Sequence, residues 1–288
     1  MVGIGTTARH RTLGPTRAKP QWKRPMETLD RIFDLTGRVA VITGGNGGIG
    51  LGIAQALAAA GCNVSIWGRN ADKNKSAAAT MAGCAGKVDT RVCDVTDPAS
   101  VKAAMAGTLR TFGRVDGCFA NAGIGGGGRH AFIDRTEEQW RSMFATNLDG
   151  VFHVFQAAAR HMTERATAGD KFGRLVATSS LASLFGTARN EHYAATKAAI
   201  NALVRALAVE LARQGVTSNA ILPGWIKSDM TARVLADEKF VGAVMPRIPV
   251  RRFGEPSDFG GIAVYLMSNA SSYHTADCFV IDGGYTAF

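Results

Sequence analysis

The sequence predicts an α/β protein in which about seven parallel strands form one doubly wound sheet and helices cover both faces. The first observation is that short β-branched runs alternate with longer alanine-rich runs along most of the chain. Such alternation favours a doubly wound parallel sheet. The second is that 288 residues with 46% hydrophobic side chains are enough for one large buried core, so the fold needs no second domain.

A glycine-rich turn joins the first expected strand to the first expected helix. Residues 38–43 (RVAVIT) form the strand, and GGNGGIG leads into an alanine-rich stretch. The glycines fall where a chain must turn tightly, approach a pyrophosphate and pack a helix against a strand. Because phosphates bind at helix N-termini, we expect a Rossmann-type dinucleotide site. The residues expected to line it are Gly44, Asn46, Gly48, Ile49 and Gly50.

The second expected strand, residues 62–68 (CNVSIWG), ends where the adenosine ribose of a dinucleotide should lie. Arg69 and Asn70 follow it. An acidic residue at this point would accept from a free 2′-hydroxyl, whereas an arginine pairs with a 2′-phosphate. Arg69 therefore favours NADP as the cofactor. NAD remains the alternative, because an exposed arginine is also common on protein surfaces.

The remaining elements continue the alternation. Strands are expected at 87–95, 114–123, 173–179, 216–222 and 278–282, and helices at 72–82, 98–112, 136–162, 191–213 and 256–269. Two of these strands end in residues that suit the cofactor. Asp94 is placed to accept from the adenine amino group, and Val95 follows it. After the next strand, the short run Asn121, Ala122 and Gly123 forms a floor beside the cofactor.

The candidate catalytic groups lie in one short stretch. Tyr193 and Lys197 stand four positions apart on an expected helix, so both side chains leave the same face. A phenol has a pKa of about 10, and a neighbouring ammonium lowers that pKa, which makes proton transfer at neutral pH feasible. Ser180, near the end of the strand GRLVATSS, is placed to hydrogen-bond a substrate carbonyl. Ser179 and Ser183 remain alternatives.

Basic side chains are concentrated at the start of the chain. The formal net charge is +10, and residues 1–25 hold six basic residues and no acidic one. Because this segment is also rich in Thr, Gly and Pro, we expect a flexible arm, followed by one catalytic domain at 26–288. A transit-like leader and a natural start at Met26 both stay open. The smaller excess in the rest of the chain does not indicate a nucleic-acid partner.

Cysteine usage and hydropathy indicate the compartment in which the protein works. The five cysteines are scattered without a C-x-x-C pair or histidines at ligand spacing, so neither a metal site nor a disulfide framework is expected. Cys93 and Cys278 are interpreted as small core residues. No apolar run is long enough to span a membrane. We therefore expect a cytoplasmic protein with reduced thiols.

Together these motifs resemble those of the short-chain dehydrogenase/reductase family, over about residues 36–286. The matching segments are TGGNGGIG, CDV, ANAG, NLDGVF with Asn147, Ser180 with Tyr193 and Lys197, PGWIKSDM and the terminal DGG. Two positions depart from the usual pattern. Ala120 stands where family members usually carry Asn, and Ser228 stands where Thr is usual, which keeps a hydroxyl.

The resemblance implies an oxidoreductase that moves a hydride between a nicotinamide cofactor and a carbonyl or secondary alcohol. It implies that Ser180 orients the carbonyl and that Tyr193 gives the proton. Lys197 then lowers the tyrosine pKa and holds the nicotinamide ribose, while Asn147 supports a proton-relay water. Further cofactor contacts are implied at Pro223, Gly224, Ile226 and Ser228. His192 points away from Tyr193, since helix neighbours diverge by about 100°, and is interpreted as a rim residue.

Substrate choice is expected in the segments 124–135, 184–192 and 225–252, which follow strand ends. They carry basic residues, namely Arg129, His130, Arg189, Lys227 and Arg233. The overall likeness runs to 3-oxoacyl-(acyl-carrier-protein) reductases, which act on carrier-bound substrates, and to gluconate- or glucose-type sugar dehydrogenases as the alternative. A third hypothesis is a non-catalytic NADP-binding sensor or scaffold, which the four filled catalytic positions disfavour.

The helices expected at 146–162 and 191–213 are apolar over more than one face. A helix that covers one side of a sheet needs a single apolar stripe, so the surplus implies a partner outside the domain. Alanines on the second helix let backbones approach closely, which favours helix-against-helix contact across a two-fold axis. We therefore expect a homotetramer built through a four-helix contact.

Overall fold

The computed structural model describes residues 28–125 and 130–288. The expected arm at 1–25 and the rim residue Arg129 lie outside the described residues.

Seven parallel strands form one sheet in the order β3-β2-β1-β4-β5-β6-β7. The strands are β1 (Val39–Thr43), β2 (Asn63–Gly68), β3 (Val88–Val92), β4 (Gly117–Ala120), β5 (Gly173–Thr178), β6 (Val216–Pro223) and β7 (Cys278–Ile281). The strand order reverses at β1, which pairs with both β2 and β4. This confirms the expected doubly wound sheet and puts its switch point, where such sheets bind ligands, between β1 and β4.

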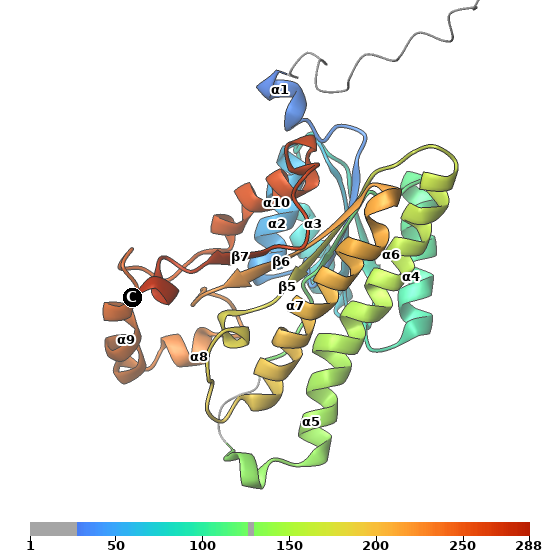
Figure 1. Cartoon of the computed structure of the whole chain (residues 1–288). Helices are drawn as coiled ribbons and strands as arrows, with labels where there is room; N and C mark the ends of the chain where they lie inside the picture. Colours follow the sequence, from blue (N-terminus) through green and yellow to red (C-terminus); the bar gives the residue numbers. More distant parts are fainter. Residues whose placement is uncertain (1–27, 126–129) are drawn as a thin grey trace, which may run out of the picture.

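Helices cover both faces of the sheet (Figure 1). One layer consists of α2 (Gly48–Ala59), α3 (Ala71–Ala79) and α10 (Gly260–Met267), and the other of α4 (Pro98–Phe112), α6 (Gly150–Thr167) and α7 (Glu191–Leu211). Each layer has its own apolar core against the strands. The strands between them are buried on both sides, which is why β1 reads VAVIT without polar alternation.

Several element boundaries differ from the sequence-based expectation. The helix expected at 136–162 consists of α5 (Glu137–Phe144), a π-helical turn η3 (Ala145–Asp149) and α6, which continues to Thr167. Likewise, the helix expected at 256–269 begins as a 3-10 turn, η7 (Pro256–Phe259), because Pro256 opens it. The strand expected at 114–123 pairs only over Gly117–Ala120.

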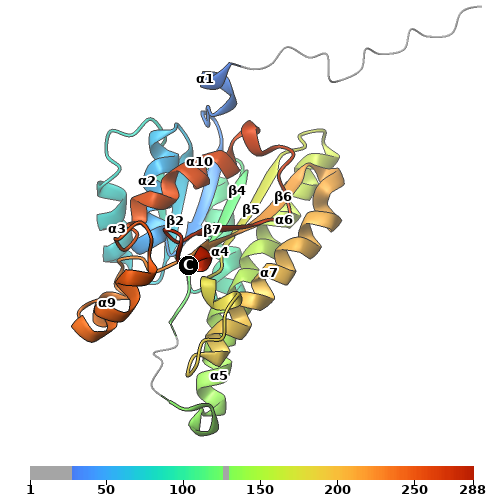
Figure 2. The same cartoon turned by 60° about the vertical axis from the view of Figure 1, so that its left-hand side comes forward.

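Three short helices were not expected, namely α1 (Leu29–Ile32), α8 (Ala232–Leu235) and α9 (Glu238–Val244). Asp237 is the N-cap of helix α9, because its carboxylate accepts from the backbone N–H groups of Lys239 and Phe240. In Figures 1 and 2, α9 lies outside both helix layers. Trp225 and Phe240 stack edge-to-face between the end of β6 and this helix, so α9 is attached to the segment that follows β6.

No described helix is both long and apolar enough to cross a bilayer. Within residues 28–125 and 130–288, no three His, Cys, Asp or Glu side chains gather as a metal site would require.

Candidate active site

The glycine turn lies at the carboxyl end of β1. Gly44 adopts a φ of +63°, a left-handed conformation that side chains other than glycine rarely tolerate. A Cβ on Gly50 would overlap the side-chain amide of Asn121 and the carbonyl oxygen of Gly44. The turn therefore closes tightly against the end of β4, and only glycine fits at these two positions.

The N-terminus of α2 fits the pyrophosphate of a dinucleotide. Gly47 is the N-cap, and no described side chain caps the helix there. Its first backbone N–H groups thus have no intrahelical or side-chain acceptor, which leaves them available to an anion. A Cβ on Gly47 would meet no atom within 4 Å, so the space in front of the turn is open.

Side chains at the ends of β2 and β3 surround the expected adenosine end. Arg69 is exposed. The Asn70 side chain accepts from the backbone N–H of Lys73 at 2.9 Å and so caps α3. One Asp94 oxygen accepts from the backbone and the hydroxyl of Thr96, and both bonds lower the Asp94 pKa. Val95 is buried.

Asn121 ties three strand ends together. Its side-chain amide donates to the Thr43 and Gly44 carbonyls, at 3.2 and 3.4 Å. Its side-chain oxygen accepts from the Thr178 hydroxyl at 3.0 Å. The Thr43 hydroxyl in turn accepts from the backbone N–H groups of Asn121 and Ala122. Asn121 thereby holds the ends of β1, β4 and β5 in register.

The three serines after β5 have different surroundings. The Ser179 hydroxyl is buried and donates to the Lys197 carbonyl at 2.9 Å, and the Ser183 hydroxyl donates to the Ser180 carbonyl at 2.6 Å. The Ser180 hydroxyl oxygen accepts from the backbone N–H of Ala182, which leaves its own proton for another acceptor. Of the three, Ser180 is thus the one whose hydroxyl is available to a substrate.

Tyr193 and Lys197 lie on the same face of α7, as their spacing predicts. The Lys197 ammonium is 5.6 Å from the centre of the Tyr193 ring and donates to the Thr178 carbonyl at 2.7 Å. Burial lowers the pKa of Lys197 to about 8. Burial also raises the pKa of Tyr193, and the nearby Ser180 hydroxyl acts in the opposite direction. The phenol therefore needs the ammonium and the hydroxyl together to release its proton at neutral pH.

Asn147 lies in the π-helical turn and is fully buried. Its side-chain oxygen accepts from the Ile124 N–H at 2.8 Å, and its amide donates to the Ile124 carbonyl at 3.0 Å. A Cβ on Gly123 would lie 3.1 Å from that oxygen and 3.8 Å from the Lys197 ammonium. Asn147 and Lys197 therefore both approach Gly123. Such π-turns are frequent at functional sites.

The segment after β6 reaches back to the glycine turn. Pro223 ends β6, Gly224 donates to the Ile281 carbonyl, and Ile226 is buried. Ser228 shares a hydrogen bond with the Thr231 hydroxyl, and its Cβ would be 3.2 Å from a Cβ on Gly48. Of the cofactor contacts expected at this strand end, Ser228 therefore faces the turn between β1 and α2.

A cavity of about 600 Å³ lies beside these residues. Seven of its ten described lining residues have polar or charged side chains; the lining consists of Ile124, Gly125, His130, Arg135, Thr136, Glu138, Gln139, Ser142, Met143 and His192. Two of these residues connect it to the candidate catalytic groups, since Ile124 is held by Asn147 and His192 directly precedes Tyr193. The cavity is therefore a candidate substrate site.

The interpretation of His192 as a rim residue is wrong. The residue is 2% exposed, and its ring nitrogen Nε2 lies 3.0 Å from a guanidinium nitrogen of Arg135. Sequence reasoning missed Arg135 altogether, because nothing in the sequence connects it to a residue 57 positions away. Two of the basic side chains expected at the rim, Arg189 and Arg233, are exposed, and Lys227 pairs with Glu255.

Comparison with known proteins gives several matches. A model of the family described as Enoyl-(Acyl carrier protein) reductase matches residues 44–286. Gluconate 5-dehydrogenase of Gluconobacter oxydans is 36% identical over 256 residues, which are 88% of this chain and 97% of that protein. The 3-oxoacyl-[acyl-carrier-protein] reductase of Chlamydia pneumoniae is 32% identical over 253 residues, which are 88% of this chain and 98% of that protein.

A solved structure agrees with these matches. The gluconate 5-dehydrogenase of Burkholderia cenocepacia, in complex with NADP and tartrate, superimposes with a TM-score of 0.83 at 32% identity. The similarity covers 91% of this chain and all of that one.

Proposed function

Since this chain belongs to the short-chain dehydrogenase/reductase family, we propose that it interconverts a polyhydroxy acid and the corresponding keto acid, with NADP as its cofactor. Membership of the family makes the chain an oxidoreductase that uses a nicotinamide cofactor. The cofactor, when bound, supplies or accepts the hydride. The substrate class, the choice of NADP and the roles of individual residues belong to the proposal.

The observation that carries the substrate class is the set of polar side chains in the cavity that Ile124 and His192 also line. The Thr136 hydroxyl oxygen and the Gln139 side-chain oxygen already accept from backbone N–H groups in the capping box of α5. The protons of these two groups and the Ser142 hydroxyl are left for a substrate. A chain of hydroxyl groups can bond to them, whereas an alkyl chain cannot. The relatives that act on gluconate, by their names, support the same class.

Tyr193 is the proton donor in the proposed reduction. The Ser180 hydroxyl donates to the substrate oxygen and holds it against the phenol, and the phenol gives its proton as negative charge develops on that oxygen. The Lys197 ammonium, 5.6 Å from the ring centre, stabilises the phenolate that remains. In the oxidation direction the same phenolate takes the proton from the substrate hydroxyl.

Asn147 positions the backbone at Ile124, which lines the site. Because both of its side-chain groups bond the backbone of Ile124, the residue fixes the start of the 124–135 segment directly after Gly123, which Lys197 also approaches. We infer that this contact keeps a place for a water that connects the Lys197 ammonium to solvent. Protons lost from Tyr193 can then be replaced.

Arg69 supports NADP. It is exposed at the end of β2, and its positive charge acts on Asp94 at the adjacent strand end. A guanidinium there can pair with a 2′-phosphate. The NADP bound to the Burkholderia cenocepacia enzyme favours the same choice.

A second candidate function is reduction of a carrier-bound 3-oxoacyl thioester. Its support is three exposed apolar side chains on the substrate-side segments, Leu184, Phe185 and Met230. An acyl chain could cover such side chains. The 3-oxoacyl reductase of Chlamydia pneumoniae is almost as similar to this chain as the gluconate enzyme is.

We also propose a homotetramer in the cytoplasm. Phe152 on α6 and Val209 on α7 are large apolar side chains that the chain leaves exposed, the second by 80%. Both belong to the helices expected to form the four-helix contact. The five cysteines are all free thiols, which suits a reducing compartment.

A substrate panel tests the proposal. Cofactor oxidation is followed with NADPH and with NADH against 5-keto-D-gluconate, an acetoacetyl thioester and simple ketones. We expect the highest kcat/KM with NADPH and 5-keto-D-gluconate. A higher kcat/KM for the thioester would favour the second candidate, and the absence of turnover with every compound would support a non-catalytic role.

A further inference from the structure

Arg135 is a buried arginine at the edge of the cavity. Its side chain is 4% exposed, and it precedes the Thr136 cap of α5. Taking a guanidinium out of water is unfavourable unless its N–H groups find acceptors in a defined geometry. The contacts of Arg135 therefore indicate why its side chain is buried.

Those contacts connect three separate parts of the chain. One terminal nitrogen donates to the Arg189 carbonyl at 2.8 Å and to the His130 carbonyl at 3.4 Å. The other donates to the His192 ring at 3.0 Å. The Glu191 carboxylate lies 3.6 Å away and offsets part of the charge. Arg135 thus fastens the 184–192 segment and the first turn of α7 to the segment before α5.

The contact with Arg135 fixes the protonation state of His192. A guanidinium can only donate, so the Nε2 atom of His192 accepts and the ring proton is on Nδ1. Burial first, and then the Arg135 charge, lower the pKa of His192, so the ring is neutral at physiological pH. The neutral ring is required here, because a protonated one would place two cations in contact.

Two donors of this pair have no partner among the described residues. They are the His192 Nδ1 and the Arg135 Nε, both of which are buried. Buried donors in native proteins are nearly always hydrogen-bonded, and both side chains line the cavity. Both atoms are covered in this structure, so an oxygen of a molecule in the cavity can accept from them only after the two side chains shift toward it.

We propose that Arg135 and His192 are the specificity-determining residues of this enzyme. They hold the 184–192 segment and the start of α7 against the cavity, and they select substrates that carry hydroxyl groups next to the reacting carbon. The inference rests on the proposed function, because the hydroxyl groups are those of the polyhydroxy keto acid. Their effect is on substrate binding, since Tyr193 performs the proton transfer.

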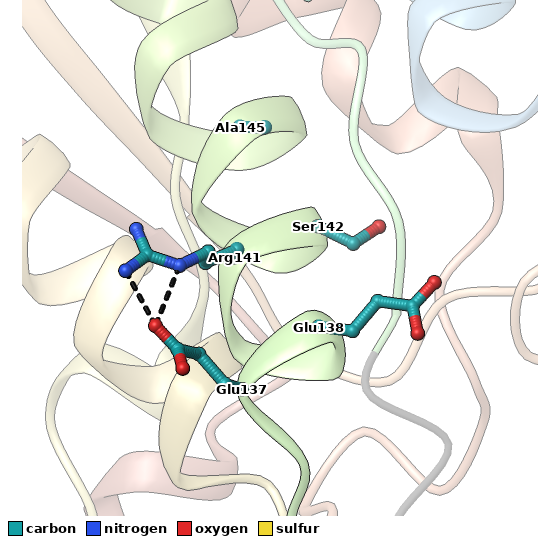
Figure 3. Close-up of a pocket in the computed structure, with 5 residues that line it drawn as sticks. All are labelled: Glu137, Glu138, Arg141, Ser142 and Ala145. Atoms are coloured by element: carbon teal, nitrogen blue, oxygen red, sulfur yellow. Dashed lines mark hydrogen bonds and ion pairs between the residues drawn. The ribbon is translucent and has the colours of Figure 1, made fainter.

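Arg141 offers a matched control. It lies on α5 only six positions further along, but it is exposed and bonds Glu137 alone, as the dashed lines in Figure 3 show. The shallow hollow around this pair is formed by one helix and involves no residue of the 184–192 segment. Arg141→Met removes an arginine from the last turn of α5 and leaves the contacts of Arg135 unchanged.

The test compares four variants by steady-state kinetics with NADPH and 5-keto-D-gluconate. Arg135→Met and His192→Leu remove the contact, and each is expected to raise the KM for the keto acid roughly 10- to 100-fold, the loss of a charge-assisted hydrogen bond. His192→Gln keeps an acceptor for the guanidinium and is expected to restore most of the affinity. Arg141→Met should behave as the wild type.

The separate effects on KM, kcat and NADPH affinity identify the role of Arg135 and His192. NADPH affinity, measured by fluorescence titration, and kcat should stay within about threefold of the wild type in all four variants. A KM for the keto acid that stays within about threefold in Arg135→Met and His192→Leu would overturn the inference. Loss of NADPH binding in both would overturn it too, because the pair would then be structural.

The outcome can be separated from that of the proposed function. If the panel identifies a different carbonyl compound as the preferred substrate, the proposed function fails, and the same four variants are compared with that compound. A large KM increase would then retain Arg135 and His192 as specificity residues for another substrate class. Unchanged KM values would overturn the inference in that case as well.

Discussion

The cofactor side and the substrate side of the site are built in different ways. On the cofactor side, the turn between β1 and α2 is formed by backbone, with glycines at fixed spacing and contacts between adjacent strand ends. On the substrate side, Arg135 bonds a backbone oxygen 54 positions away and a side-chain nitrogen 57 positions away. Backbone geometry restricts the residue types that fit, whereas long-range side-chain contacts leave no local pattern. The sequence therefore indicates the reaction class, which depends on the cofactor side, but not the choice of substrate, which depends on the substrate side.

The largest effect on turnover should come from Tyr193, which lies between the cofactor side and the substrate side. Tyr193→Phe removes the proton donor and keeps the ring, so turnover is expected to fall by about 10³-fold or more. NADPH affinity should not change, because the glycine turn is untouched. Stopped-flow rates and fluorescence titration measure the two quantities. Activity within about tenfold of the wild type would show that another group transfers the proton.

The cofactor side is tested by Arg69→Ala. Removing the guanidinium should weaken NADPH binding by roughly 10- to 100-fold and leave NADH binding nearly unchanged, because only NADPH carries the 2′-phosphate. Dissociation constants for both cofactors, measured by titration, give the comparison. Equal losses for the two would remove the assigned role and make Arg69 an ordinary surface residue.

The lowered pKa of Lys197 makes the free energy of unfolding depend on pH. Burial lowers its pKa to about 8, below the ordinary value of about 10.5. Between these two values the unfolded chain holds a proton that the folded chain has lost, so the free energy of unfolding rises with pH across this window, by at most about 3 kcal/mol. Below the window the folded protein carries the unfavourable buried charge.

Urea unfolding at pH values below, within and above this window measures the effect. Lys197→Met should remove this rise, and the exposed Lys102→Met serves as the control that keeps it. If the wild type and Lys197→Met show the same pH dependence, the Lys197 pKa is not depressed.

The smallest expected effect on chemistry comes from Val209→Glu. This substitution places a charge on an exposed apolar position of α7 and should prevent the proposed four-helix contact. Light scattering is expected to show dissociation of the tetramer, with each protomer still able to bind NADPH. A wild-type protein that is a stable monomer would contradict the proposed assembly directly.

Most of the fold was predicted from the sequence, and the candidate catalytic residues were selected from it for the same reason. The glycine spacing and the Tyr193–Lys197 spacing are local patterns, and the burial of whole strands makes the sheet visible as apolar runs. The π-turn around Asn147 was missed because it continues a helix without any change of composition. Helix α9 had a recognisable start at Asp237, but its few residues carry no helical periodicity.

The substrate side could not be predicted in the same way. His192 was assigned to the rim from its angle on an isolated helix, and that angle does not show what covers the residue. Arg135 covers it from a segment that is distant in sequence. Only the folded chain brings the two together, so neither residue has a signature that a single sequence displays.

The most direct test follows the hydride itself. The enzyme is incubated with 5-keto-D-gluconate and with NADPH that carries deuterium at both positions of the nicotinamide C4, and the product is analysed by mass spectrometry. We predict that the product gains a deuterium at the carbon that was the ketone, in step with cofactor oxidation. No label in this product, together with label in the hydroxyacyl product of an acetoacetyl thioester, would contradict the account.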